Sequence, residues 1–275
     1  MKIYFYLAIC VGIFASCKSY VQVFNTASNI GENEHGNYVY ETDTVRITYS
    51  FWEENGVMTF EIFNKTKSPI YIDWKKSSYI DNSVKLNYWA DVEKTSSQIV
   101  YDNYLFKKSS ESASKKNTIT GVSQTSSTKM ERITFIPPNS SYFRSQFYIY
   151  PVSAFLLNTK TNSEEVLRKD DNSKKTKIYK ANYNLETTPL IFRNFLTISF
   201  SEEIEDEFYI DNKFYISEVL EMERDHFEQY RYDTSVKGKW FLRDEYGNPI
   251  LFNDFESPKS FYIKIPKVAS ITKRK

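Results

Sequence analysis

The stretch VRITYSFWEENGVMTFEI, residues 45–62, decides the fold class, because it has the pattern of two strands joined by a tight turn. Apolar side chains occupy alternate positions from 45 to 51, with polar residues between them. A period of two is typical of a strand that buries one face. Asn55-Gly56 tolerates the positive φ angles of a hairpin turn, and the alternation resumes after it. The stretch therefore predicts an antiparallel hairpin.

The same alternation recurs along most of the chain. We expect further strands at residues 70–74, 84–89, 133–135, 143–149, 196–200, 240–242 and 261–265. Asp211-Asn212-Lys213 is expected to be a tight turn between strands at 208–210 and 214–216, and only residues 224–231 favour a helix. The chain has 22 Tyr and 21 Phe but only 7 Gly, and aromatic residues favour strands. The sequence thus predicts an all-β protein.

Short strands separated by frequent turn signals, with Trp74 available as a core anchor, resemble an immunoglobulin-like β-sandwich over residues 37–200. The resemblance implies an antiparallel β-sandwich with long inserted loops, followed by a C-terminal β-hairpin extension. The paired cysteines of antibody domains are absent from the sequence. A shared fold does not by itself imply a function.

Two segments rich in Ser, Lys, Thr and Asn interrupt the strand pattern, residues 107–129 and 158–180. They contain few apolar residues to bury, so we expect exposed excursions from one elaborated sandwich over residues 37–265. Alternatively, residues 158–180 mark a boundary between two domains. Residues 17–36 are expected to form a polar tether that contains an exposed His35, and residues 266–275 a basic, solvated tail.

The N-terminus has the features of an export signal: Lys2, an apolar run over residues 3–14, and Ala15-Ser16 before Cys17. It resembles the signal of a bacterial lipoprotein, although Phe14 stands where such signals usually carry Leu. The resemblance implies that residues 1–16 are a signal peptide and that Cys17 is acylated, with palmitate among its chains. It also implies a cell-envelope location, anchored in the outer membrane and facing the periplasm or the surface. A secreted protein and an N-terminally anchored one are the alternatives, since the run is shorter than the about 20 residues of a membrane span.

Removal of residues 1–16 would take away Cys10 and one basic residue, Lys2. With Cys17 acylated, no cysteine would remain to form a disulfide. The 36 basic residues would fall to 35, equal to the 35 acidic ones. A neutral chain argues against a nucleic-acid partner, because nucleic-acid binders carry a basic excess.

Few residues have the pattern of a catalytic or metal site. Asp225-His226 could provide a base or a metal ligand, but adjacent side chains point apart in a helix or a strand. The sequence has no serine elbow, no zinc-protease motif and no phosphate loop. The acidic run at 202–207 lacks the spacing of a calcium loop and is read as a connection between strands. We therefore expect no enzyme, no metal and no cofactor, with His226 and Asp225 as weak candidates.

Exposed aromatic residues are the other candidate feature. Alternation places Tyr209 and Tyr215 on the face opposite their apolar neighbours, and Trp89 and Trp240 lie beside polar residues. Such rings bind sugars or protein partners. The sequence favours a lipid-anchored, non-catalytic module that binds another envelope protein, with membrane lipid as its partner through Cys17. A carboxylate-based glycan hydrolase and a glycan-binding lipoprotein are the alternatives.

Overall fold

The computed structural model describes residues 19–90, 93–100, 122–129, 131–150, 154–157, 162–168, 174–230, 232–233, 240–241, 243–248 and 251–265. Cys17, the proposed signal peptide, the basic tail and most of residues 107–129 therefore lie outside the described residues. Within them, nearly all regular structure is β-strand, as predicted, and one four-residue helix is present.

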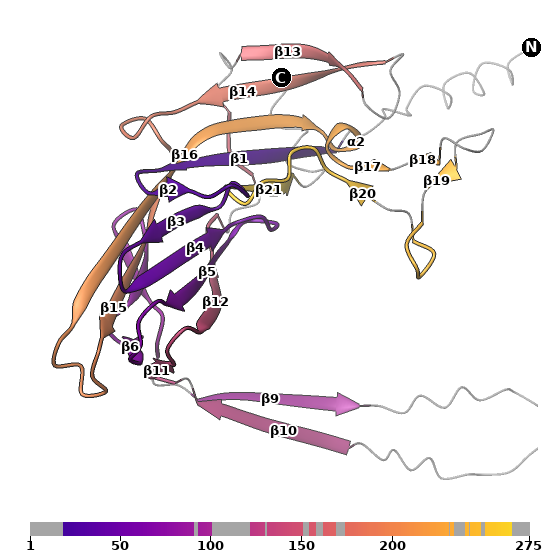
Figure 1. Cartoon of the computed structure of the whole chain (residues 1–275). Coiled ribbons are helices and arrows are strands. Elements are labelled where there is room, and N and C mark those ends of the chain that lie inside the picture. The colour runs from indigo at the N-terminus through magenta and orange to yellow at the C-terminus, as the bar shows by residue number, and fades with distance from the viewer. Residues whose placement is uncertain are drawn as a thin grey trace, which may run out of the picture.

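Two antiparallel sheets pack face to face (Figure 1). The central path of the larger sheet is β11 (Ile133–Ile136), β6 (Ile70–Asp73), β15 (Ile191–Ser199), β16 (Phe208–Glu223), β1 (Tyr20–Ser28) and β21 (Ser260–Ile265). Two hairpins branch from this path. β7 (Ser78–Asp81) pairs with β15 and with β8 (Val84–Asn87), and β14 (Lys175–Asn182) pairs with β16 and with β13 (Asn162–Leu167). The smaller sheet is β12 (Ser141–Tyr148), β5 (Val57–Asn64), β4 (Val45–Ser50), β3 (Tyr38–Glu41) and β2 (Gly31–Glu32). The predicted all-β antiparallel sandwich is confirmed, whereas the closer likeness to an immunoglobulin domain stays a prediction.

The hairpin predicted over residues 45–62 is present as β4 and β5, which pair antiparallel with Ile47 opposite Ile62. Its inward side chains pack against those of β15 and β16 in one core cluster, and the predicted anchor Trp74 is fully buried there. At the turn, Gly56 has φ +64, and a Cβ at this position would lie 2.7 Å from Cγ of Phe261. Glycine is required here by both the backbone angle and the close packing.

The core also contains a hydrogen-bonded polar cluster between the sheets. The Tyr49 hydroxyl accepts hydrogen bonds from the side-chain amides of Asn194 (3.1 Å) and Asn212 (2.8 Å). Tyr88 donates in turn to Oδ1 of Asn194 (2.9 Å). All four residues are buried, and mutual hydrogen bonding is what makes their burial tolerable. Burial raises the pKa of Tyr49 far above its usual value, so its hydroxyl stays protonated.

The predicted tether is wrong from Tyr20 onward, because β1 is an interior strand between β16 and β21. This strand buries Val21, Val23 and Phe24. The polar residues among them made the strand hard to recognise from the sequence. The buried Gln22 is accommodated because its amide donates to the backbone carbonyl of Phe155 (2.7 Å) and to Oε2 of Glu221 (2.8 Å). The sandwich thus begins at Tyr20 rather than at residue 37.

The hairpin predicted around Asp211-Asn212-Lys213 is also wrong, because these residues lie inside the continuous 16-residue strand β16. Asn212 points into the sandwich and is satisfied by Tyr49. The acidic run at 202–207 does connect β15 to β16. The predicted helix shrinks to one turn, α2 (Arg224–Phe227), because the chain returns to a strand conformation at β17 (Gln229–Tyr230).

The two predicted excursions contain paired strands rather than loops alone. β9 (Glu93–Val100) pairs with β10 (Val122–Lys129), and β13 pairs with β14. β14 then pairs with the second half of β16, so this hairpin extends the larger sheet. Near the C-terminus, β17 pairs with β20 (Leu251–Phe252), and β18 (Tyr232–Asp233) pairs with β19 (Trp240–Phe241), before β21 returns beside β1.

Candidate binding site

The structure does not bring the two sequence-predicted site residues together. His226 lies in α2, is 3% exposed, and packs edge-on against Phe255 with ring centroids 5.9 Å apart. The Asp225 side chain is 70% exposed and pairs with Arg168 at 3.2 Å. Adjacent residues of one helical turn face different directions, and these two do. His35 lies in an exposed turn, with a side chain 76% exposed beside Glu34.

The part of the chain that the structure describes holds no group of three or more His, Cys, Asp and Glu placed to bind a metal ion. Nor does it contain a helix long and apolar enough to cross a membrane. The candidate binding sites among the described residues are therefore surface depressions.

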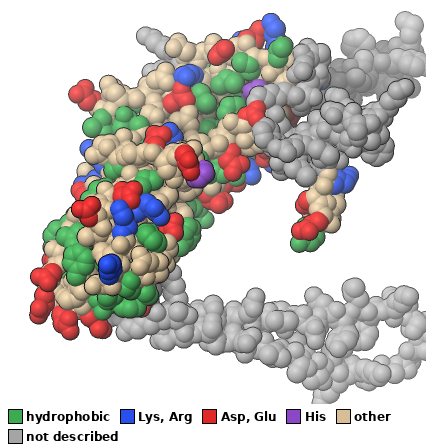
Figure 2. Space-filling model, viewed as in Figure 1, with side chains coloured by type: hydrophobic (Ala, Val, Ile, Leu, Met, Phe, Trp, Pro, Cys, Tyr) green, Lys and Arg blue, Asp and Glu red, His purple; other side chains and the backbone are tan. Residues whose placement is uncertain are grey.

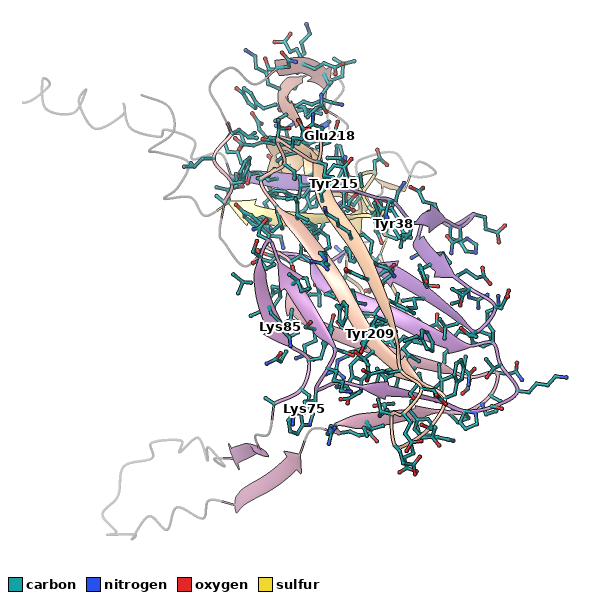
Figure 3. All side chains as sticks on the ribbon, turned by 90° about the vertical axis from the view of Figure 1, so that its left-hand side faces the viewer. Tyr38, Lys75, Lys85, Tyr209, Tyr215 and Glu218 are labelled. Atoms are coloured by element: carbon teal, nitrogen blue, oxygen red, sulfur yellow. The ribbon has the colours of Figure 1, made fainter. Side chains whose placement is uncertain are left out.

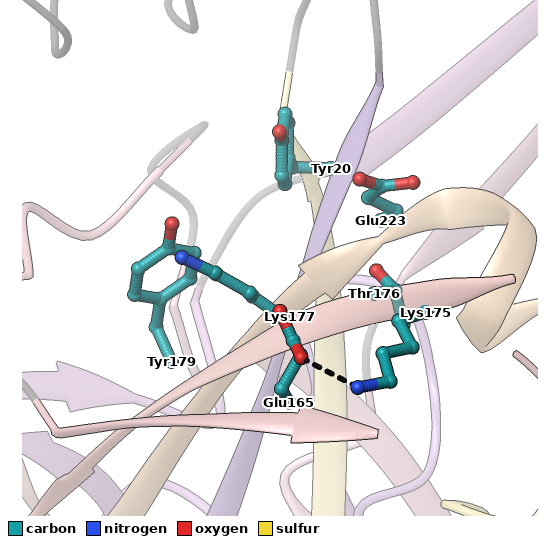
Figure 4. Close-up of a pocket in the computed structure, with 7 residues that line it drawn as sticks. All are labelled: Tyr20, Glu165, Lys175, Thr176, Lys177, Tyr179 and Glu223. Carbon is teal, nitrogen blue, oxygen red and sulfur yellow. Dashed lines mark hydrogen bonds and ion pairs between the residues drawn. The ribbon is translucent and has the colours of Figure 1, made fainter. Parts of the chain in front are cut away.

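A small pocket of about 260 Å³ lies between the β13–β14 hairpin and the start of β1 (Figure 4). It contains two carboxylates, Glu165 from β13 and Glu223 from the end of β16. Glu165 pairs with Lys175 at 3.1 Å, and Arg168 lies 3.9 Å from Glu223. Both carboxylates thus lie beside a cation, and the volume falls below the roughly 300–1,000 Å³ usual for ligand pockets.

A larger, shallow depression of about 570 Å³ lies on the outer face of the larger sheet. It is lined by Lys75, Lys76, Lys85, Arg132, Phe195, Thr197, Glu207 and Tyr209. Figure 3 looks onto this face and shows Lys75, Lys85 and Tyr209 around the same region of the sheet. We call this feature the basic depression.

The strand alternation of β15 and β16 supplies the aromatic wall of the basic depression. Phe195, Thr197 and Tyr209 occupy outward positions, and Thr197 lies directly opposite Tyr209 in the register. The rings of Phe195 and Tyr209 stack with centroids 5.5 Å apart and an angle of 24° between their planes. Tyr209 remains 55% exposed. Stacking fixes the orientation of a ring that still presents apolar surface to a ligand.

A tight turn after β6 positions two of the cations. Oδ1 of the fully buried Asp73 accepts hydrogen bonds from the backbone N–H groups of Lys75 (2.9 Å) and Lys76 (3.3 Å). Ser77 Oγ donates to the Asp73 carbonyl (2.7 Å) and accepts from the backbone N–H of Thr197 (2.9 Å). The turn is therefore fixed to β15. The third cation, Arg132, lies 3.5 Å from Oδ2 of Asp73.

Glu207 neutralises one of the cations. Its carboxylate lies 2.5 Å from Nζ of Lys76 and accepts a hydrogen bond from the Tyr209 hydroxyl. The hydrogen bond with Lys76 lowers the pKa of Glu207, and the same bond raises the pKa of Lys76. The hydrogen bond with Glu207 raises the pKa of Tyr209, so the phenol stays protonated at neutral pH.

Two cations of the basic depression remain uncompensated. Lys75 and Lys85 are exposed, and neither has an ion pair within the described residues. Lys75 Nζ lies 6.0 Å from the centroid of the half-buried Trp89 ring. Thr197 is fully buried at the depression, and its Oγ1 has no hydrogen-bond partner among the residues described. The basic depression thus combines positive charge with an aromatic wall.

Sequence reasoning found one part of this site and missed the rest. It placed Tyr209 on the exposed face, which the structure confirms. It missed the lysines, because nothing in the sequence shows that residues 75 and 85 meet residue 209. A Lys-Lys pair directly after the buried Trp74 was the available signal. Tyr215 lies further along β16, as Figure 3 shows, and is not among the lining residues.

Comparisons of the chain with protein-family models, with curated proteins and with solved structures find no match.

Proposed function

We propose that this chain is a lipid-anchored, non-catalytic envelope protein that binds an anionic saccharide in the basic depression. The observation that carries the proposal is the juxtaposition of Lys75 and Lys85, which have no ion pair among the described residues, with the stacked Phe195 and Tyr209. The anchor is the acyl group expected on Cys17. This proposal favours the glycan-binding alternative over the protein partner that the sequence alone suggested.

The chemistry of the site suits a sugar ring that carries a sulfate, a phosphate or a carboxylate. The C–H face of a pyranose packs against an aromatic ring, while its anionic group pairs with ammonium groups. Because the lysines are exposed, their attraction for the anion is screened by salt. We expect weak, salt-sensitive binding.

The test is equilibrium binding of a sulfated oligosaccharide and of the same oligosaccharide without sulfate, each at low and at high salt. The proposal expects the sulfated ligand to bind more tightly, with the difference shrinking as salt rises. A phosphorylated and a carboxylated ligand separate the possible anionic groups. Equal binding of sulfated and unsulfated ligands, or binding of neither, would contradict the proposal.

A protein partner remains the second candidate, because a large exposed ring lies on β11, the strand that follows Arg132 of the basic depression. Phe135 on β11 is 52% exposed and packs edge-on against Tyr71 of β6, with centroids 5.6 Å apart. Large exposed aromatic residues are enriched at protein interfaces. A photo-crosslinking residue at position 135 should then capture one envelope protein in cells, while the same residue at the distant, 81% exposed Tyr246 should not. Equal capture at both positions would argue against this candidate.

The hydrolase alternative needs a carboxylic acid and a carboxylate about 5–10 Å apart on either side of the scissile bond. In the basic depression, Glu207 is engaged by Lys76 and Tyr209, and Asp73 lies buried beneath the turn. We therefore propose binding without turnover. Release of shorter products from the bound oligosaccharide would contradict this part of the proposal.

A further inference from the structure

The start of β1 fixes the chain to the sandwich close to the proposed acylation site. The carbonyl of Ser19 accepts a hydrogen bond from the backbone N–H of Arg224 (2.9 Å), and Tyr20 is only 6% exposed. Cys17 precedes Ser19 by two residues. Consecutive Cα atoms are about 3.8 Å apart, so the Cα atoms of Cys17 and Ser19 are separated by at most about 7.6 Å. No tether of the predicted length exists between the acyl group and the fold.

We infer that the sandwich rests directly on the lipid headgroups, with the basic depression held away from the membrane. The inference rests on the acylation of Cys17 in the proposed function. We define the proximal end as Ser19, Tyr20, Glu223 and the β13–β14 hairpin, and the distal loop as residues 200–207. The proximal end contacts the bilayer surface, and the distal loop faces away from it.

Strand β16 connects the two ends. It pairs with β1 at Glu223, opposite Tyr20, and its first residue, Phe208, follows the distal loop. Its 16 residues span about 50 Å along the strand, at about 3.3 Å per residue. Figure 1 shows β13 and β14 at the top and the connection between β15 and β16 at the lower left. Tyr209, near the start of β16, therefore places the basic depression next to the distal loop.

The distribution of charge favours the same orientation on an anionic membrane. The distal loop carries five acidic residues, Glu202, Glu203, Glu205, Asp206 and Glu207, and Figure 2 shows acidic side chains gathered at the lower left. Anionic headgroups repel these five carboxylates, which outnumber the four cations of the basic depression beside them.

The described residues of the proximal end have a basic excess: five basic side chains (Arg168, Lys174, Lys175, Lys177 and Lys180) against three acidic ones (Glu164, Glu165 and Glu223). Exposed Lys177 has no ion pair among the residues described. The final residue of β21, Ile265, pairs with Tyr20, so the C-terminal tail starts at this end. In the sequence, that tail carries four basic residues and no acidic one over positions 266–275. Basic residues near an anionic membrane surface are attracted to it, and an acyl chain with a basic cluster binds more firmly than either does alone.

The mature chain suits a direct measurement, because an acylated Cys17 leaves no other thiol in it. Single cysteines are introduced by Lys177→Cys at the proximal end and by Glu203→Cys in the distal loop, both at exposed positions. Each acylated variant is labelled with a fluorescent donor. It is then reconstituted in vesicles of phosphatidylethanolamine and phosphatidylglycerol that contain a headgroup-labelled acceptor.

Energy transfer to the vesicle should be several-fold greater from position 177 than from position 203. A flexible Gly/Ser linker inserted between Lys18 and Ser19 is the matched control, and it should reduce the difference. Equal transfer from both positions, or greater transfer from position 203, would overturn the inference while leaving the anchor intact. Absence of a fatty-acid label on Cys17 would overturn the anchor and the orientation together.

Discussion

The carboxylate of Glu207 lies 2.5 Å from Nζ of Lys76, so one of the four cations around the basic depression is held in an internal ion pair. Glu207 is the last residue of the distal loop, directly before β16, whereas Lys76 lies in the turn after β6. The pair therefore joins two elements that frame the site. It also makes the charge of the site sensitive to the protonation of Glu207.

Binding of a sulfated ligand should strengthen as the pH falls through the lowered pKa of Glu207. The hydrogen bond with Lys76 lowers this pKa below the usual value of about 4.3. Protonation of Glu207 releases Lys76 to the ligand, while a sulfate stays ionised. We expect an affinity a few-fold higher on the acidic side, measured by titration at constant ionic strength.

Glu207→Gln is the control for this pH effect, because it removes the charge at every pH. The affinity of this variant at neutral pH should match the higher affinity that the wild type reaches at acidic pH. Much of the pH dependence of binding should be lost. For folding, a lowered carboxyl pKa means that the pair stabilises the protein above the unfolded-state pKa. This contribution is lost as the pH falls through the folded-state pKa. Weaker binding by Glu207→Gln would show that the carboxylate assists the ligand instead.

Tyr209→Ala should weaken saccharide binding roughly three- to tenfold, since an aromatic contact contributes about 0.5–1.5 kcal/mol beyond its buried area. The loss should be similar for ligands with different anionic groups, because the ring contacts the sugar. Tyr215→Ala, on the same strand but outside the basic depression, is the matched variant and should bind normally. Equal losses in the two variants would place the ligand elsewhere on the sheet.

Tyr49→Phe should lower the free energy of unfolding by about 1–3 kcal/mol, the cost of leaving buried donors unsatisfied. The change removes the acceptor shared by Asn194 and Asn212 without altering the ring. Urea unfolding measures the effect, and Tyr246→Phe at an 81% exposed position should leave stability unchanged. A Tyr49→Phe protein as stable as the wild type would mean that the amides find other partners.

Gly56→Ala should destabilise the fold by about 1–3 kcal/mol, because it combines a strained φ of +64 with a Cβ too close to Phe261. Gly36→Ala is the comparison that isolates the backbone cost. Gly36 also has a positive φ, +78, but nothing lies within 4 Å of an added Cβ. Thermal or urea unfolding should therefore show a larger loss at position 56 than at position 36. Equal losses would mean that Phe261 moves aside freely.

Local patterns predicted the parts of the fold whose side chains alternate without interruption. The hairpin at 45–62 is the clearest example, because its alternation and its Asn-Gly turn specify the same structure. Strand β1 was missed because Gln22, Asn25 and Thr26 make it look polar. Their partners, such as Glu221 for Gln22 and Glu218 for Asn25, are remote in sequence and could not be foreseen.

Partners that are remote in sequence also explain why a turn was wrongly predicted within β16 and why the cations of the basic depression were missed. Asp211-Asn212-Lys213 has the composition of a turn, yet the hydroxyl of Tyr49 on the other sheet makes a buried Asn212 acceptable. The exposure of Tyr209 followed from alternation within its own strand. The cations beside it come from the turn after β6, from β8 and from Arg132 directly before β11, so only the sheet topology brings them to Tyr209.

The most direct test of the central claim is the affinity of the charge-reversed double variant Lys75→Glu, Lys85→Glu for a sulfated oligosaccharide. Both side chains are exposed, so the fold should be unaffected. Lys213→Glu, which reverses one charge on the outer face of β16 outside the basic depression, is the control. The account predicts at least a tenfold loss of affinity for the double variant and little change for the control. Undiminished binding by the double variant would contradict it.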